Sequence, residues 1–171
     1  MILKVLYGRA IEDYDMAIKL NHLDSLSYMG RGTAYEKLND YKRAERDYSN
    51  AISINAQFVD VFLLRGNLYY KLGSYQKSLL DINKALEFSP KHAMAYNNRG
   101  VVNRTLGNYQ LAILDFNRSI ALDPDYTKSY VNRAKTYLMT GRLEQALRDY
   151  RTADGMGDKS ARDYLKSKGI N

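Results

Sequence analysis

Apolar and small side chains recur along the chain at helical spacing, and short polar or glycine-containing breaks separate the helical stretches. In the clearest example a helical pattern covers residues 93–106, a break follows at Gly107–Asn108, and a second pattern covers residues 109–122. Asp123–Pro124 then ends the second stretch. Glycine suits the left-handed residue that ends a helix, and proline cannot continue one. The pattern therefore predicts pairs of helices joined by short turns.

Three series of residues recur with a period of 34, which indicates a repeat architecture. Arginine occurs at Arg31, Arg65, Arg99 and Arg133. Aspartate occurs at Asp13, Asp47, Asp81, Asp115 and Asp149. An aromatic residue occurs at Tyr28, Phe62, Tyr96 and Tyr130. The same punctuation returns in the mid-unit turns, with Gly73 and Gly141 in two further units and Asn39, which also tolerates left-handed backbone, in the first.

Small residues recur where the two helices of a pair must approach each other. The first helices carry Gly32, Gly66, Gly100 and Ala134. The second helices carry Ala10, Ala44, Ser78, Ala112 and Ala146. Because glycine inside a helix costs about 1 kcal/mol relative to alanine, its return in three units indicates a packing requirement. We therefore predict antiparallel helices too close together for larger side chains.

At this point the chain resembles the tetratricopeptide repeat family. The third unit carries the motif best, at Tyr96, Arg99, Gly100, Leu106, Gly107, Tyr109, Ala112, Phe116 and Pro124. It departs from the motif at Asn103 and Ser119, and the second unit departs at Ser78 and Ile82. The resemblance covers nearly the whole chain and implies an all-α fold, a right-handed α-solenoid of antiparallel helix pairs. It implies protein interaction in general and leaves the partner open.

The repeat divides the chain, taken as a single domain over residues 1–171, into six parts. Residues 1–24 match only the second helix of a repeat, so we interpret them as a half repeat. Four full repeats are expected at 25–58, 59–92, 93–126 and 127–158. Residues 158–171 form a predicted C-terminal capping helix with Asp158 as its N-cap residue.

Composition and motifs point away from catalysis and membrane insertion. The chain has no cysteine, and His22 and His92 lie in predicted turns without a spaced partner, so we expect no metal site and no cofactor. No phosphate-binding loop is present, and we predict that the protein is not an enzyme. No apolar stretch reaches the roughly 18 residues of a membrane helix, and no cleavable signal pattern is found. We expect a cytoplasmic protein.

The formal charge of +7 is concentrated toward the C-terminus. Residues 1–58 carry no net charge, residues 59–126 carry +2 and residues 127–171 carry +5. A basic C-terminal third favours acidic partners, although a solvated surface would show the same composition.

The first helices of a helix-pair stack line its concave face, so their residues not used in packing are candidate ligand contacts. Asn amides can bind a peptide backbone, and Lys and Arg can bind a carboxylate. The candidate peptide-binding residues are Leu63, Asn67, Lys71, Asn97, Asn98, Arg104, Lys128, Asn132 and Lys135. They predict a scaffold that binds a protein or peptide segment in the concave groove. The cations favour a segment with Asp, Glu or a free C-terminal carboxylate.

The resemblance also implies a more specific possibility, a five-residue carboxylate clamp of some heat-shock co-chaperones. It would fall on Leu63, Asn67, Asn98, Lys128 and Asn132. Leu63 replaces a Lys of the clamp and Asn132 replaces an Arg. Three alternatives stay open: a groove whose polar residues only maintain solubility, a nucleic-acid-binding surface, and a structural fragment of a larger multidomain scaffold. The pI near 9.4 favours nucleic acid, but most aromatic residues belong to the predicted core and are not available for base stacking.

Two further expectations concern packing. The Arg and Asp series predict ion pairs within each unit, such as Arg31 with Asp47, or alternatively between neighbouring units, such as Arg31 with Asp13. The half repeat is expected to leave an apolar face open, because its first helix is missing from the pattern. We expect this face, with Tyr7, Ala10, Tyr14, Ile2, Leu3 and Leu6, to promote self-association.

Overall fold

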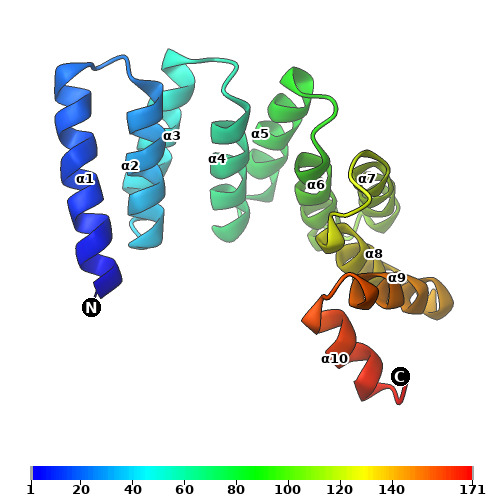
Figure 1. The fold of residues 1–171 in the computed structure, drawn as a ribbon. Coiled ribbons are helices and arrows are strands. Elements are labelled where there is room, and N and C mark those ends of the chain that lie inside the picture. The colour runs from blue at the N-terminus through cyan, green and yellow to red at the C-terminus, as the bar shows by residue number, and fades with distance from the viewer. Residues whose placement is uncertain (1, 171) are drawn as a thin grey trace. The chain divides into compact units, whose positions relative to one another are not determined.

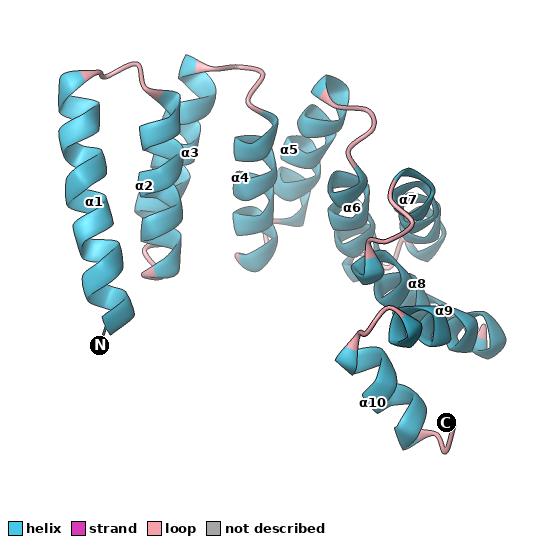
Figure 2. Ribbon diagram, in the orientation of Figure 1, coloured by secondary structure: helices cyan, strands magenta, loops and turns pink. Residues whose placement is uncertain are grey.

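A computed structural model describes residues 2–170, with the side chain of Ile2 outside the description, and shows ten helices and no strand within that range (Figures 1 and 2). The chain forms two compact units, which we call the N-terminal unit (residues 1–89) and the C-terminal unit (residues 90–171). The predicted all-α fold of antiparallel helix pairs is confirmed in both.

The N-terminal unit contains five helices. They are α1 (Ile2–Leu20), α2 (Ser25–Lys37), α3 (Tyr41–Ile54), α4 (Val59–Lys71) and α5 (Tyr75–Phe88). The pairs α2–α3 and α4–α5 pack along their lengths, and α1 packs against α2. The core of α2, α3 and α4 includes the fully buried residues Tyr48, Val61 and Leu68.

The C-terminal unit contains the other five. They are α6 (Ala93–Thr105), α7 (Tyr109–Leu122), α8 (Thr127–Met139), α9 (Leu143–Gly155) and α10 (Lys159–Ser167). The pairs are α6–α7 and α8–α9, and α10 covers α9. Asp158 caps α10 as predicted, because its side chain accepts a hydrogen bond of 2.8 Å from the Ala161 N–H. Ala161 and Leu165 of α10 are buried, and Tyr164 stacks on Tyr150 of α9 with ring centroids 4.3 Å apart.

The turn inside each helix pair requires one residue of left-handed backbone. Gly107 has φ of 80°, and Asn39 takes the same role with φ of 62°. After each of them the chain closes the same hydrogen bond back to the helix, from Asn108 N–H to Asn103 O at 2.9 Å and from Asp40 N–H to Tyr35 O at 2.9 Å. The bond satisfies a carbonyl at the helix end, so Asn39 preserves the turn that glycine forms elsewhere.

The small residues do lie at the closest approach of paired helices. A β-carbon on Gly100 of α6 would lie 2.6 Å from Phe116 of α7, whose ring is fully buried. A β-carbon on Gly32 of α2 would lie 2.9 Å from Tyr48 of α3. These glycines therefore make room for an aromatic ring on the second helix, which explains why the sequence accepts their cost in helix stability.

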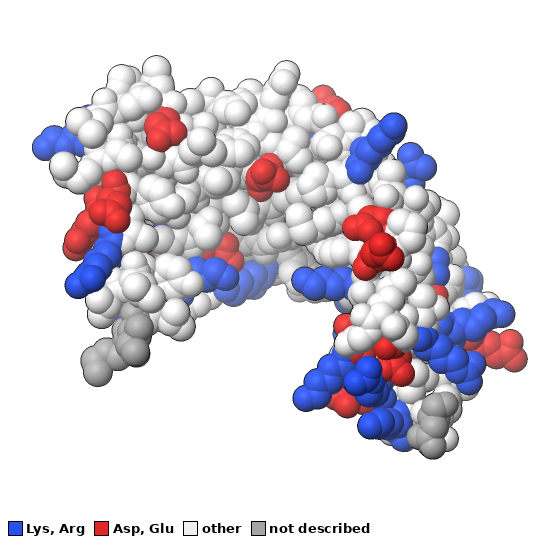
Figure 3. All heavy atoms as spheres, in the orientation of Figure 1, with Lys and Arg blue, Asp and Glu red and all other residues white. Residues whose placement is uncertain are grey.

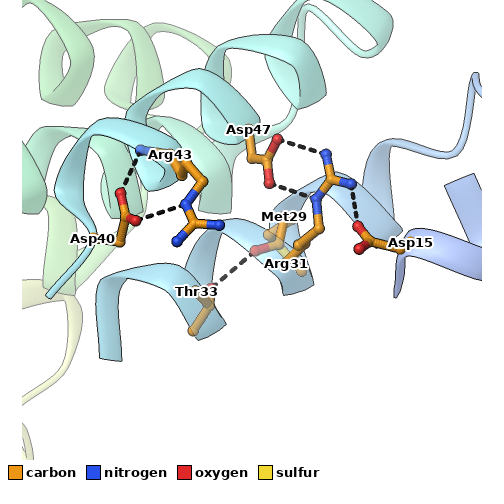
Figure 4. Close-up of polar contacts among 7 residues, drawn as sticks. All are labelled: Asp15, Met29, Arg31, Thr33, Asp40, Arg43 and Asp47. Carbon is orange, nitrogen blue, oxygen red and sulfur yellow. Dashed lines mark hydrogen bonds and ion pairs between the residues drawn. The ribbon is translucent and has the colours of Figure 1, made fainter. Parts of the chain in front are cut away.

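The Arg and Asp series form ion pairs within each 34-residue repeat, as favoured from the sequence. Arg31 of α2 donates from Nε and Nη2 to the two carboxylate oxygens of Asp47 at 2.7 and 2.8 Å (Figure 4). The other pairs are Arg65 with Asp81, Arg99 with Asp115, and Arg133 with Asp149, each with one N···O distance of 2.7 or 2.8 Å. Hydrogen bonding to Asp47 raises the pKa of Arg31, so this guanidinium stays charged. The alternative pairing of Arg31 with Asp13 is wrong.

Three of these arginines, Arg31, Arg65 and Arg133, also reach a third helix through a residue that lies outside the Asp series. Arg31 Nη1 donates to Asp15 of α1 at 2.5 Å (Figure 4), Arg65 Nη1 to Ser49 Oγ of α3 at 2.9 Å, and Arg133 Nη1 to Asn117 Oδ1 of α7 at 2.6 Å. Each acceptor lies 16 residues before its arginine. One rigid guanidinium therefore joins a helix pair to the helix before it and sets the register of three helices.

The exposed face of α1 differs from the prediction. Tyr7, Ala10 and Tyr14 are half-buried, and the Tyr14 ring lies over Gly30 of α2, where the missing β-carbon leaves space for it. The expectation that this side faces water is wrong for Tyr14, which packs on α2, whereas Tyr7 and Ala10 are only partly covered. Leu3 and Leu6 are exposed as expected. The part of the prediction that concerns the Ile2 side chain lies outside the described residues.

Candidate functional site

A chain of hydrogen bonds connects the first helices of the C-terminal unit. Asn132 of α8 donates from Nδ2 to Asn97 Oδ1 of α6 at 2.9 Å. Arg104 of α6 donates from Nη1 to the backbone O and to Oδ1 of Asn132, both at 3.2 Å. The chain continues inward, since Ser129 Oγ lies 3.5 Å from Asn97 Oδ1 and 2.7 Å from Ser119 Oγ. Three predicted site residues, Asn97, Arg104 and Asn132, are thus joined in one network.

This network fixes the position of a cation. Arg104 is only partly exposed, and its guanidinium is held against α8 rather than extended into solvent. Burial raises the pKa of Tyr150 in α9, and the charge of Arg104 opposes that rise. An arginine ordered in this way loses little conformational entropy when it binds a carboxylate.

Two lysines of α8 lie on the same side of the helix as Asn132. Lys128, Asn132 and Lys135 are spaced four and three residues apart, which places them on one face, and both lysines are exposed. Hydrogen bonding from Ser160 lowers the pKa of Asp158, and the charge of Lys135 acts in the same direction. Together with Arg104, the lysines define what we call the α6–α8 face: Asn98, Arg104, Lys128, Asn132 and Lys135.

The C-terminal unit, which contains the α6–α8 face, is more basic than the N-terminal unit. Residues 90–171 carry 14 Lys and Arg against 8 Asp and Glu, a net charge of +6, whereas residues 1–89 carry 12 against 11. In the C-terminal unit Lys and Arg atoms lie among Asp and Glu atoms on the surface over α9 and α10 (Figure 3). An anionic segment is therefore attracted to this unit more strongly than to the N-terminal one.

The predicted site residues of the N-terminal unit have different surroundings. The side chain of Leu63 is only 3% exposed and belongs to the hydrophobic core, so little of it can contact a ligand. Asn67 and Lys71 of α4 are exposed. Lys71 Nζ lies 3.9 Å from Glu36 Oε1 of α2 and 4.6 Å from the centre of the Tyr41 ring. Because Glu36 offsets the charge of Lys71, this pair provides little net attraction for an anion.

The structure also modifies the roles expected of the asparagines. Asn97 is 4% exposed and its amide is used by Asn132 and Asn98, at 2.9 and 3.2 Å. Asn132 donates to Asn97 and accepts from Arg104, so its carbonyl oxygen serves the fold. These two amides therefore order the face, and the exposed cations beside them are the groups that a ligand can reach. The five clamp positions are divided between the units, with Leu63 and Asn67 in one and Asn98, Lys128 and Asn132 in the other.

A cavity between α9 and α10 was not predicted from the sequence. It has a volume of about 330 Å³ and is lined by Leu143, Leu147, Tyr164, Lys168 and Ile170. A neighbouring hollow of about 270 Å³ shares Leu147 and includes Arg148 and Arg151. The spacing of Leu143 and Leu147, one helical turn apart on a helix with a basic face, was the available signal.

Two classes of site are not found in the part of the chain that the structure describes. Residues 2–170 contain no group of three or more His, Cys, Asp or Glu side chains placed to hold a metal ion. No helix within the described residues combines the length and the apolar character needed to cross a membrane.

Helix pairs of constant length, joined by a repeated Arg–Asp pair and carrying a polar face on their first helices, define a helical-repeat protein. A family model for the tetratricopeptide repeat matches residues 25–58 and 93–126, and a second one matches residues 116–148. A model described as a TPR repeat matches residues 66–107. The chain therefore belongs to the tetratricopeptide repeat family, whose fold supports protein–protein interaction scaffolds.

Several solved structures share the fold. MamA has a TM-score of 0.80 at 17% sequence identity, with 91% of both chains covered. YrrB, described as a TPR protein with an unusual peptide-binding site, has a TM-score of 0.75 at 23% identity and covers 94% of this chain and 84% of its own. A thermophilic TPR protein from Thermus thermophilus has a TM-score of 0.79 at 22% identity, with 94% of this chain and 89% of its own covered. No curated protein sequence matches the chain.

Proposed function

We propose that the chain acts by binding rather than by catalysis, and that its C-terminal unit binds an acidic or carboxylate-bearing peptide segment on the α6–α8 face. The observation that carries this proposal is the hydrogen bonding of Arg104 to Asn132, which holds a guanidinium between the two first helices beside the exposed Lys128 and Lys135. A fixed fork of donors is suited to a carboxylate, and the lysines add charge around it.

The choice of an acidic ligand follows from the balance of charge on each unit. The C-terminal unit has a net charge of +6, and the five residues of the α6–α8 face include three cations and no anion, although the charge of Lys135 also acts on Asp158 at the start of α10. In the N-terminal unit Glu36 lies beside Lys71, and Asp60 is exposed on the same helix as Lys71. Charge selection by this protein is therefore assigned to the C-terminal unit. A likeness in fold to YrrB, whose structure is described as having a peptide-binding site, supports a peptide as the ligand.

The expected affinity is modest. Exposed ion pairs contribute about 0–1 kcal/mol each, and an extended peptide loses conformational entropy when it binds. Affinities on the order of micromolar are therefore expected, with partner selection set by the sum of several contacts.

Reversing two charges on the α6–α8 face tests the proposal. A Lys128→Glu, Lys135→Glu variant should bind acidic peptides about ten-fold or more weakly, because two attractive contacts become repulsive. The probe is a synthetic array in which each peptide appears with Asp and Glu or with Asn and Gln, and with a free or amidated C-terminus. The affinities of the selected peptides are then measured by fluorescence anisotropy.

The matched control is Lys91→Glu, Arg118→Glu, which makes the same change of charge at exposed positions outside this face. If both variants lose the same affinity for acidic peptides, the effect comes from net charge alone, and a defined site on the α6–α8 face is contradicted. A single-stranded RNA is measured alongside. If RNA binds more tightly than every peptide and weakens log-linearly with salt, the face serves a nucleic acid and the peptide proposal is wrong.

A further inference from the structure

One face of α1 has the spacing of a helix–helix seam but is only partly covered by the described residues. Its members are separated by three, four, three, four and three positions, the spacing of two helices packed along their lengths. They are Leu3, Leu6, Ala10, Asp13, Ala17 and Leu20, and we call them the α1 stripe. The three leucines are 66%, 55% and 85% exposed, in chain order. Such a row of large apolar side chains in water indicates an interaction surface.

Comparison with the other second helices shows that the stripe includes positions built for helix contact. The residues 34 positions apart from Ala10 and Ala17 are fully buried in every later repeat. They are Ala44, Ser78, Ala112 and Ala146 for the first, and Ala51, Ala85, Ser119 and Ala153 for the second. In α1 both alanines are only half-buried. The same small residues that admit a neighbouring helix elsewhere are therefore available on α1 for another one.

The stripe also contains the one member of the Asp series that lacks an arginine. Asp47, Asp81, Asp115 and Asp149 each hold an arginine of their own repeat. Asp13 is exposed, and among residues 2–170 no cation lies within ion-pair distance of it. Arg9, one helical turn away, is exposed and has no carboxylate partner in the same range. Arg9 and Asp13 are four positions apart on α1, close enough to attract each other, but the structure shows no ion pair between them. An occupant of the stripe that carries a cation and an anion can pair with both.

We infer that the occupant is the α1 helix of a second copy of the chain, packed antiparallel. The spacing of the stripe reads the same in both directions, with large residues at its ends and small ones at its centre. Antiparallel pairing about the midpoint between Ala10 and Asp13 sets Leu3 opposite Leu20, and Leu6 opposite Ala17, of the second copy. It also brings Arg9 next to Asp13 of the other helix, twice by symmetry.

Parallel pairing is disfavoured by charge, since it would set Asp13 against Asp13 and Arg9 against Arg9 across the seam. The antiparallel contact is thus self-complementary in both shape and charge. Its size is limited, because α1 has 19 residues and a length of about 28 Å. A single helix pair buries less than the roughly 1,200–2,000 Å² of a stable interface, so the dimer should dissociate in the micromolar range.

Charge exchange across the seam tests both the partner and the orientation. Sedimentation velocity of the full chain from about 1 to 500 μM should show a monomer–dimer equilibrium. Asp13→Arg alone and Arg9→Asp alone should each weaken it about ten-fold or more, because like charges then meet. An equimolar mixture of the two variants should form a heterodimer, because each arginine then faces an aspartate. Circular dichroism verifies that both variants remain helical.

The control is Glu12→Arg, an exposed position on α1 outside the stripe, which makes the same charge change as Asp13→Arg and should leave dimerisation unchanged. The absence of cysteine allows a second measurement, in which Leu6→Cys and Ala17→Cys chains are mixed under mild oxidation. Cross-links between the two variants should form faster than between like chains. A monomer at every concentration, or a dimer insensitive to both charge variants, would overturn the inference and assign the stripe to a different helix.

Discussion

Replacing Asp47 by Ala should lower the free energy of unfolding by about 3–5 kcal/mol, the largest effect expected of any single substitution in the Arg–Asp series. The Asp47 side chain is fully buried, and its two oxygens accept from Arg31, whose side chain is 13% exposed. Removing the carboxylate leaves a largely buried guanidinium without its main partner. Urea unfolding followed by circular dichroism measures the loss.

A second carboxylate on the same guanidinium provides the control. Asp15 also accepts from Arg31, but its side chain is 52% exposed, so Asp15→Ala should cost about 0–1 kcal/mol. Equal costs for the two substitutions would show that burial does not decide the strength of these pairs. That result would contradict the view that the repeated pair sets helix register.

Replacing Phe116 by Ala should cost about 3–5 kcal/mol and should reverse the effect of a second substitution at Gly100. In the natural background Gly100→Ala should be destabilising by about 1–2 kcal/mol, because its β-carbon would lie 2.6 Å from the buried Phe116 ring. Without the ring, the same change should be stabilising by up to about 1 kcal/mol, the helix preference of alanine over glycine. A double-mutant cycle by urea unfolding gives the coupling.

Gly8 is the matched control for that cycle, because it lies inside α1 and a β-carbon there would meet no other helix within 4 Å. Gly8→Ala should therefore be stabilising by about 0.5–1 kcal/mol in either background. If Gly100→Ala is stabilising even beside Phe116, the close approach of α6 and α7 is not what requires glycine.

The period of 34 predicted the fold because packing repeats with it. The stretch predicted over residues 109–122 is α7, and the stretch predicted over 93–106 ends one residue earlier, at Thr105. The contact of Asp15 with Arg31 was not predicted because the acceptor 16 residues before the arginine changes type among Arg31, Arg65 and Arg133, from Asp15 to Ser49 to Asn117. A sequence period identifies positions where the same residue type recurs. It does not identify equivalent positions that carry different side chains.

The site was less predictable for a related reason. The sequence placed Asn97 and Asn132 on first helices, but it cannot show that their amides bond to each other. The cavity lined by Leu143 and Tyr164 depends on α10, a terminal helix without an equivalent elsewhere in the chain. The helices can therefore be predicted from the sequence, whereas interactions between side chains of different repeats can be identified only in the structure.

NMR mapping of a bound acidic peptide decides whether the α6–α8 face is its binding site. The ¹⁵N-labelled chain is titrated with an acidic peptide selected from the array and with its Asn and Gln counterpart. Chemical-shift changes should be concentrated at Asn98, Arg104, Asn132 and Lys135, with little change for the neutral peptide. Changes centred on α7 and α9, or equal responses to both peptides, would contradict the assignment of the α6–α8 face as a site for acidic segments.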